Sequence, residues 1–264
     1  MTIRDLHPWD VTPKEACAIQ KELAAQVSTR TSARRIRTVA GVDLAFAGDT
    51  AFGVVVVLSF PDLQILEIAE AVVSVRLPYI PGLLSFREVP VLLPAFRRLT
   101  HEPDVIFADG QGRLHPRRFG IACHLGLLLD RPTIGCGKSL LCGDYEVPGS
   151  AKGDSTAIRH RGETIGRAVR TRDNVSEMFI SIGHKVSLKR AVDLALAVTG
   201  KYRIPEPTRQ ADIAAAKQCV HVIVDRLFAA EHEARLLFVD NGFEDLCHGQ
   251  RLDVLMHIVR CDHE

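Results

Sequence analysis

The spacing of hydrophobic residues divides most of the chain into short helices and strands. Ala16, Ile19, Leu23 and Val27 recur at helical spacing, which predicts a helix over 13–28. Apolar, β-prone runs predict strands at 39–46, 52–59, 64–75, 104–109, 132–136, 164–171 and 178–182. Further helices are expected at 85–99, 116–129, 188–198 and 205–224.

The order of these elements predicts an α/β fold with a mixed central sheet flanked by helices. Three strands with short connections between positions 39 and 75 should form an antiparallel meander. The strand at 104–109, the following helix and the strand at 132–136 have the βαβ pattern of a parallel pair. The glycine-rich, polar stretch 143–162 is expected to be a loop. This combination is typical of ribonuclease H-like folds.

Composition limits the classes of function. A hydrophobic content of 47% in 264 residues is sufficient for a substantial core. The formal net charge of +1 excludes a protein that coats nucleic acid through bulk charge. Two local basic clusters remain, and each is also compatible with a solvated face. They are Arg30, Arg34, Arg35 and Arg37 in one cluster, and Arg113, Arg117 and Arg118 in the other.

Cysteine usage and hydropathy indicate the compartment. The seven cysteines are scattered and include no CxxC pair, which fits reduced thiols better than a disulfide framework. The polar N-terminus lacks the apolar run of a signal peptide, and no apolar stretch reaches the roughly 18 residues of a membrane span. We therefore expect a soluble cytoplasmic protein with no membrane partner, and no feature indicates an obligate protein partner.

Asp43 and Asp109 are the carboxylates of greatest interest, because each lies in or at the end of an apolar strand. A charged group there is costly unless it is paired or bound to a metal. If the two strands are neighbours, their backbones lie about 5 Å apart and the carboxylates repel each other. Mg²⁺ between them would remove that conflict and would suit phosphodiester hydrolysis. The simpler alternative is that each aspartate only caps a loop.

The stretch Pro78-Tyr79-Ile80-Pro81 predicts a stiff, exposed tip, because two prolines clamp an aromatic and a β-branched residue. Such a tip suits a wedge inserted into nucleic acid. Behind it, Glu88 could support the metal, or it could complete a capping box with Ser85 at the start of the helix. Pro90 and Pro94 should kink this helix or shift its start.

Two further polar residues could reach the same site. His115 is a candidate general acid–base or phosphate contact, although a loop histidine is also compatible with simple solvation. Lys138 follows the strand at 132–136 in the sequence GCGK, which lacks the glycine spacing of a phosphate loop. As a single lysine near the site, it could still contact a phosphate.

At this point the motifs resemble those of the endonuclease V family, the repair nucleases for deaminated purines. The resemblance rests on VAGVDLAF around Asp43, on PYIPGLLSFRE, and on FADGQGRLHPRRFGIACHLG around Asp109. Three more motifs, TIGCGKSLLCG, SIGHKVSL and KYRIPEPTRQAD, extend it over about residues 13–218. The motifs are long and occur in the same order as in the family.

The resemblance implies a ribonuclease H-like catalytic domain at 1–219, followed by an extension of unknown role at 220–264. It implies a Mg²⁺-dependent or Mn²⁺-dependent deoxyribonuclease of DNA repair that recognises hypoxanthine (deoxyinosine) in DNA. The expected cut is at the second phosphodiester bond on the 3′ side of the lesion and leaves 3′-hydroxyl and 5′-phosphate ends. A ribonuclease that acts on inosine in single-stranded RNA, or a protein that binds damaged strands without cutting, are the alternatives.

The resemblance also implies roles for individual residues. Asp43 and Asp109 match the metal carboxylates, Glu88 the third acidic position and Asp212 a fourth, which spacing alone does not reveal. His115 and Lys138 match further site positions, and His124 lies in the same motif. The wedge residues would be Pro78, Tyr79, Ile80 and Pro81, and the pocket for the extruded base would be formed by Gly82, Leu84, Gly110, Gly112, Gly120 and Ile121.

The stretch beyond about residue 220 has no counterpart in that resemblance. Its apolar runs at 236–239 and 252–259 suit a small helical or strand addition, or a partly mobile tail. A zinc site is the alternative, although the spacing of its candidate ligands matches no finger pattern. Those residues are Cys247, His248, His257, Cys261 and His263.

Overall fold

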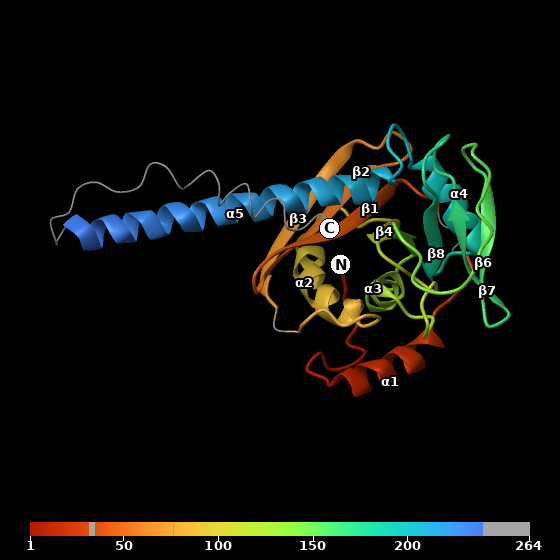
Figure 1. Ribbon diagram of the computed structural model, residues 1–264, viewed down its shortest axis with the longest axis horizontal. Helices are drawn as coiled ribbons and strands as arrows, with labels where there is room; N and C mark the ends of the chain where they lie inside the picture. Colours follow the sequence, from red (N-terminus) through yellow and green to blue (C-terminus); the bar gives the residue numbers. More distant parts are fainter. Residues whose placement is uncertain (32–34, 76, 240–264) are drawn as a thin grey trace. The chain divides into compact units, whose positions relative to one another are not determined.

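The computed structural model describes residues 1–31, 35–75 and 77–239. Its centre is a sheet of eight strands in the spatial order β3-β2-β1-β4-β5-β8-β7-β6 (Figure 1). The strands are β1 (Thr38–Ala47), β2 (Thr50–Ser59), β3 (Ile65–Ser74), β4 (Val105–Asp109), β5 (Thr133–Gly137), β6 (Ser155–His160), β7 (Glu163–Val169) and β8 (Met178–His184). The predicted mixed sheet is thereby confirmed.

Strand directions agree with the expected topology in the first two thirds of the sheet. β1, β2 and β3 form the predicted antiparallel meander, in which Asp43 lies opposite Val54. β4 runs parallel to β1, with Val42 beside Ala108, and β5 runs parallel to β4. An antiparallel meander continued by parallel strands is the ribonuclease H-like arrangement, and that prediction is confirmed.

The loop predicted at 143–162 is wrong, because it contains β6. This strand pairs with β7 in an antiparallel hairpin, and β7 continues onto β8. β6 lies at the edge of the sheet, and only Ile158 among its six residues is buried. A strand that buries one side chain carries too weak a hydrophobic pattern to be recognised.

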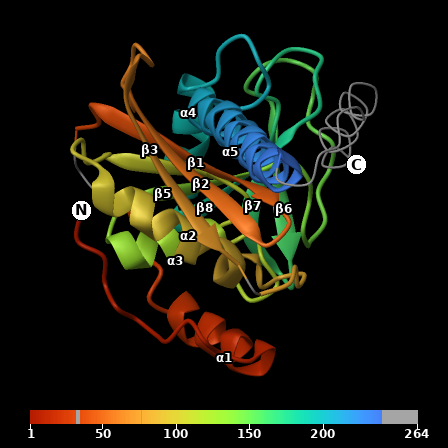
Figure 2. The same ribbon diagram turned by 90° about the vertical axis from the view of Figure 1, so that its left-hand side faces the viewer.

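Helices cover both faces of the sheet. α2 and α3 lie on one face, while α4 and the first turns of α5 lie on the other (Figures 1 and 2). Two apolar clusters fill the layers, one containing Phe96 and Leu125 and the other containing Phe107 and Leu194. The helices are α1 (Pro13–Ala24), α2 (Leu84–Arg98), α3 (Ile121–Leu129), α4 (Leu188–Ala197) and α5 (Glu206–Val239).

The start of α3 and the end of α5 differ from the prediction, whereas the start of α2 agrees with it. α3 begins at Ile121 rather than Pro116, because Arg118 has a φ of 59° and breaks the helical path before Gly120. α2 keeps its expected start although Pro90 and Pro94 lie inside it. α5 continues to Val239 and includes the apolar run predicted at 236–239.

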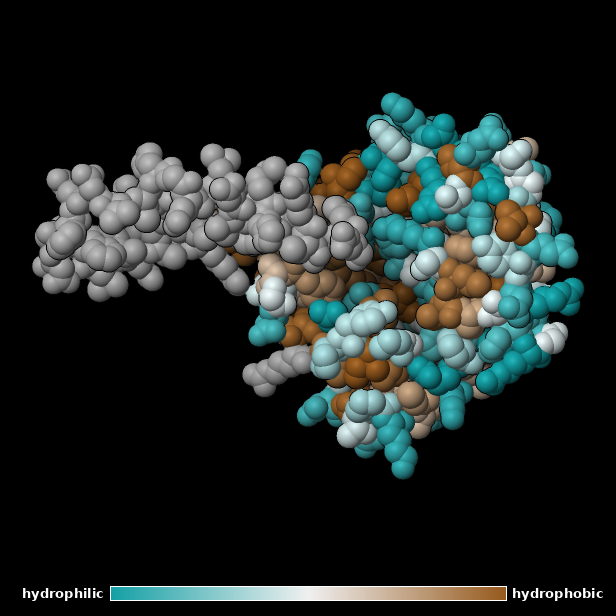
Figure 3. Space-filling view, viewed as in Figure 1, coloured by the Kyte–Doolittle hydropathy of each residue, from teal (hydrophilic) through white to brown (hydrophobic). Residues whose placement is uncertain are grey.

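The chain divides into two compact units, Met1–Val220 and His221–Glu264. The suggested zinc ligands between 247 and 263 lie outside the described residues, as does Arg34 of the first basic cluster. Within the described part, none of the helices combines the length and apolarity that a bilayer crossing requires. Figure 3 shows hydrophilic side chains over most of one face of the protein, with hydrophobic patches between them.

Candidate active site

The register of the sheet brings Asp43 and Asp109 together. Val42 of β1 pairs with Ala108 of β4, so the next residue of each parallel strand carries a carboxylate at the same edge. Asp43 Oδ1 accepts a hydrogen bond of 2.9 Å from its neighbour's backbone N–H at Leu44. The predicted proximity of the two strands is confirmed, and both side chains are partly buried.

Lys138 lies directly beside this pair. It follows β5, whose Cys136 pairs with Asp109 across the sheet. Its Nζ lies 2.6 Å from Asp109 Oδ2, so the ammonium group balances one of the carboxylates. The structure therefore brings Lys138 to the two aspartates, as the sequence suggested.

Glu88 approaches the aspartates from α2. The capping box that would have explained this residue is absent, because Leu83 occupies the N-cap and makes no side-chain capping bond. Ser85 is instead a buried residue inside the helix, and its Oγ has no hydrogen-bond partner in the described part of the chain. Glu88 is consequently not needed for the helix start.

Burial is the main cause that disfavours the ionised forms of these three carboxylates. Burial raises the pKa of Glu88 to about 8, with further contributions from Asp43 and Asp109. Burial and the charge of Asp109 likewise raise the pKa of Asp43 to about 8. The pKa of Asp109 is also raised by burial, although Lys138 opposes that effect. The single positive charge of Lys138 is therefore too small to balance the ionised forms of these carboxylates.

Asp212 contributes a fourth carboxylate from α5. It is exposed, and its negative charge raises the pKa values of Asp43 and Asp109. The start of α5 packs tightly on β1, since a Cβ added at Gly41 would overlap the carbonyl oxygen of Pro207. Reasoning from spacing missed Asp212, because an exposed helical aspartate gives no signal in hydrophobic periodicity.

Among the described residues, no three carboxylate, imidazole or thiol groups stand at the spacing of a formed metal site. The composition of the cluster nevertheless fits a hard divalent cation, which prefers oxygen ligands. Asp43, Glu88 and Asp109 are the residues that could hold such an ion. Their raised pKa values are the physical reason to expect one, because bound cations favour the ionised carboxylates.

The stretch Pro78–Pro81 forms an exposed tip directly before α2. Tyr79 is 62% exposed, whereas Ile80 packs against buried Leu83 and Phe86. Leu83 donates its N–H to the carbonyl of Ile80 over 2.9 Å, which closes a turn at the base of the tip. The tip is thus anchored on one side and presents its aromatic ring to solvent.

Three side chains fix the carbonyl oxygen of Gly82, which has a φ of 77°. It accepts hydrogen bonds from Gln20 Nε2 at 3.0 Å, from His115 Nε2 at 3.0 Å and from Arg117 Nη2 at 2.7 Å. Gln20 Oε1 in turn accepts from Arg117 Nε at 2.6 Å. This network ties the base of the tip to α1 and to the loop before α3.

His115 is buried within this network. Its Nδ1 accepts from the backbone N–H of Arg117 at 3.1 Å while Nε2 donates to Gly82, so both nitrogens are occupied. Burial, reinforced by Arg117 and Arg118, lowers the pKa of His115 to about 4. The structure places a neutral histidine under the tip, and its part in catalysis stays a prediction.

Gln20 is a residue that the sequence reasoning missed. It lies four positions after Ala16, on the buried stripe of α1, and is 1% exposed. A glutamine at a core position of a helix was the available signal, because a buried amide requires partners. His124 is also buried, but it lies in a cluster of aromatic rings with His7 and Trp9.

Of the residues predicted for the base pocket, Gly110, Gly112, Gly120 and Ile121 lie in the loop between β4 and α3 or at the start of α3, and Gly82 and Leu84 lie at or just before the start of α2. Gly110 contacts Ile121 closely, since a Cβ added there would lie 2.8 Å from Ile121 Cγ2. Gly112 and Gly120 pack against backbone atoms that leave no room for a side chain. Leu84, the first residue of α2, is partly buried. Their assignment to a pocket stays a prediction.

Comparison with known proteins gives consistent matches over most of this chain. The family model described as Endonuclease V matches residues 21–213. A relative from Roseiflexus castenholzii, named Endonuclease V, is 48% identical over 211 residues, which make up 80% of this chain and 95% of the relative. The similarity therefore extends over nearly the full length of that relative.

Two solved structures give the same result. The crystal structure of Endonuclease V from Streptomyces avermitilis aligns with a TM-score of 0.78 and 40% identity, covering 84% of this chain and 100% of that one. Endonuclease V from Ciona intestinalis, crystallised with a 24mer DNA containing an inosine followed by a ribo-adenosine, aligns with a TM-score of 0.70 and 27% identity. That alignment covers 79% of this chain and 98% of the Ciona chain.

Proposed function

Because the chain belongs to the endonuclease V family of nucleases, we propose that it cleaves DNA beside deoxyinosine in a metal-dependent reaction. The proposed cut is at the second phosphodiester bond on the 3′ side of the lesion and leaves 3′-hydroxyl and 5′-phosphate ends. The observation that carries this proposal is the group of Asp43, Glu88 and Asp109, whose pKa values burial raises together.

Mg²⁺, or Mn²⁺ in its place, is the proposed cofactor. Asp43, Glu88 and Asp109 would hold it, and Asp212 adds negative charge nearby. A bound divalent ion supplies Lewis-acid charge for the phosphate and lowers the pKa of a coordinated water. Lys138, whose pKa the neighbouring Asp109 helps to raise, stays protonated beside the same group. It is therefore suited to stabilise negative charge on the phosphate.

Recognition of the lesion is proposed to depend on the tip and on the glycine-rich loop. A deaminated base pairs weakly, so less free energy is needed to extrude it than to extrude a normal base. Tyr79 is exposed and would stack in the gap that the extruded base leaves. Backbone groups near Gly82 and Gly110 would then contact the base, since neither residue has a side chain to block the approach.

Inosine-containing RNA is the second candidate substrate. RNA differs from DNA at the 2′-hydroxyl, so protein contacts to that group would decide between the two nucleic acids. The Ciona relative was crystallised with DNA that contains a ribo-adenosine after the inosine. A protein that only binds the lesion would not need the acidic cluster. Asp43, Glu88, Asp109 and Asp212 are all present, which favours catalysis.

Incubation with end-labelled strands containing one inosine tests the proposal. The wild-type protein with Mg²⁺ should cut such a DNA strand at one position, and Asp43→Ala should abolish cutting while retaining binding. Comparing the cleavage of matched DNA and RNA strands in the same gel measures the substrate preference. Repeating the reaction with a chelator tests whether cleavage requires a metal. A nuclease function would be contradicted if the wild type bound inosine-containing DNA and RNA but left both strands uncut.

A further inference from the structure

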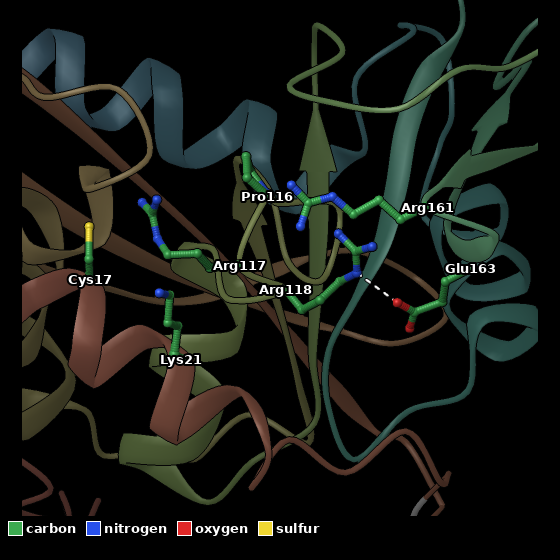
Figure 4. A pocket seen from close by; sticks show the side chains of 7 residues that line it. All are labelled: Cys17, Lys21, Pro116, Arg117, Arg118, Arg161 and Glu163. Carbon is green, nitrogen blue, oxygen red and sulfur yellow. Dashed lines mark hydrogen bonds and ion pairs between the residues drawn. The ribbon is translucent and has the colours of Figure 1, made fainter.

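An open pocket of about 720 Å³ lies between α1, the loop before α3 and the turn of the β6–β7 hairpin (Figure 4). It is lined by Cys17, Lys21, Pro116, Arg117, Arg118, Arg161 and Glu163. Four cationic side chains against one carboxylate leave its lining with a formal charge of +3. A pocket of this charge on a nearly neutral chain is suited to an anion.

Most of this positive charge is not balanced within the protein. Arg118 Nε pairs with Glu163 Oε2 at 2.8 Å, as the dashed line in Figure 4 shows. The guanidinium of Arg117, by contrast, donates only to the neutral oxygens already described at Gln20 and Gly82. In the parts of the chain that the structure describes, the side chains of Lys21 and Arg161 have no ion-pair or hydrogen-bond partner.

Arg161 also occupies an unfavourable backbone position. It forms the two-residue turn of the hairpin with Gly162, and the φ values are 55° and 79°. Asparagine, aspartate or glycine is favoured at such turn positions, because the Cβ of other residues crowds the backbone at positive φ. The turn therefore does not explain the arginine, whose guanidinium instead reaches the pocket (Figure 4).

The hairpin that carries Arg161 is held firmly against the loop before α3. Glu163 accepts from Arg113 Nη2 at 2.6 Å as well as from Arg118. Arg118 Nη2 also donates to the backbone carbonyl of His160 at 3.1 Å. These contacts fix both ends of the turn, so Arg161 is presented at a defined place.

We propose that this pocket is a phosphate subsite that binds the backbone of the DNA strand beside the lesion, with Lys21 and Arg161 as its ligands. Arg117 connects the pocket with the tip, because the guanidinium that lines the pocket also donates to Gly82. A strand separated at Tyr79 would therefore pass close to the pocket. Guanidinium and ammonium groups bind phosphate oxygens through charge-assisted hydrogen bonds that do not read sequence.

The inference rests on the proposed function for the identity of the strand. Because phosphate binding of this kind is independent of sequence, the pocket should add affinity equally for inosine-containing and inosine-free DNA. Removing a cation that binds phosphate should also reduce the dependence of binding on salt, since fewer counterions are released.

The test uses full-length protein with Lys21→Gln, Arg161→Asn and the double substitution. Arg161→Asn suits the turn, so the variant should fold at least as stably as the wild type. Without divalent metal, the double variant should bind both DNAs about tenfold more weakly. The slope of log K against log salt should decrease by about 1 for each phosphate-binding cation that is removed.

Lys189→Gln is the matched control, since it removes an 87% exposed lysine on α4, away from the pocket lining. It should leave affinity and salt slope unchanged. A folded double variant with wild-type affinity and slope would overturn the subsite, even if the wild type cuts inosine-containing DNA. If the wild type fails to cut but the double variant loses affinity for both DNAs, the subsite stands and the proposed nuclease function falls.

Inorganic phosphate distinguishes a free anion from a strand. Phosphate should weaken DNA binding by the wild type more than by the double variant, because both anions compete for the same cations. The proposal would be overturned if phosphate stabilised the wild type but not Arg161→Asn, while the two proteins bound DNA equally well. That result would assign the pocket to a free anion.

Discussion

Replacing Glu88 by glutamine should stabilise the metal-free protein at alkaline pH. Burial, with Asp43 and Asp109, raises the pKa of Glu88 from 4.5 to about 8. The folded state therefore binds this proton more tightly than the unfolded state. The stability that this bound proton contributes is fully present below pH 4.5, the unfolded pKa of Glu88, and is lost as the pH rises through about 8, its folded pKa. Glutamine is nearly isosteric and does not ionise, so the variant avoids that loss.

The size of the effect follows from the same two pKa values. Each pH unit of difference corresponds to about 1.4 kcal/mol, so ionised Glu88 costs the fold at most about 5 kcal/mol above pH 8. Water penetration and the hydrogen-bond needs of the new amide reduce the gain. We expect about 2 kcal/mol near pH 8, or a melting temperature higher by about 5 °C for a chain of this size.

Urea and thermal unfolding in a chelator, at about pH 5 and about pH 8.5, measure this difference. The variant should be more stable than the wild type only at the higher pH. The exposed Glu146→Gln is the control and should change little at either pH. Added Mg²⁺ should stabilise the wild type more than Glu88→Gln, because a ligand that binds only the folded state stabilises it by mass action. Equal destabilisation of Glu88→Gln at both pH values would refute the electrostatic reasoning.

Two further substitutions test the recognition tip and the sheet. Tyr79→Ala should weaken binding of inosine-containing duplex about tenfold, because the variant has no ring to stack on a base, and should affect cleavage of a single strand much less. Equal losses on both substrates would argue against a wedge. Gly41→Ala should lower the free energy of unfolding by about 3 kcal/mol, measured with urea, because the added methyl overlaps the carbonyl of Pro207. Unchanged stability would show that α5 can move away from β1 at little cost.

The parts of the fold that were predictable are those with long apolar runs. β2, β4 and β5 are buried over most of their length and β1 over its first half, and the order of these strands identified the meander and the parallel pair. β6 was missed because a single buried residue, Ile158, marks it. The start of α3 was misplaced because Pro116 is equally compatible with the turn that the chain makes there.

The residues of the candidate site also differ in how far the sequence alone predicts them. Asp43 and Asp109 were recognisable because a carboxylate in an apolar strand is costly, and that cost is a local property of the sequence. The relation between Gln20 and Gly82 is different, since 62 residues separate them and each looks ordinary in its own segment. The alternative role of Glu88 in a capping box could be dismissed only from the observed N-cap at Leu83.

The tip and the acidic cluster are mechanically one unit through α2. The carbonyl of Gly82 is fixed by three donors, and α2 begins two residues later at Leu84. About one helical turn, a rise of about 6 Å, therefore separates the start of α2 from Glu88. Buried Phe86 holds this first turn in the core, so Glu88 and the base of the tip belong to one anchored segment. A rigid link of this length supports the proposed cut at a set distance from the lesion.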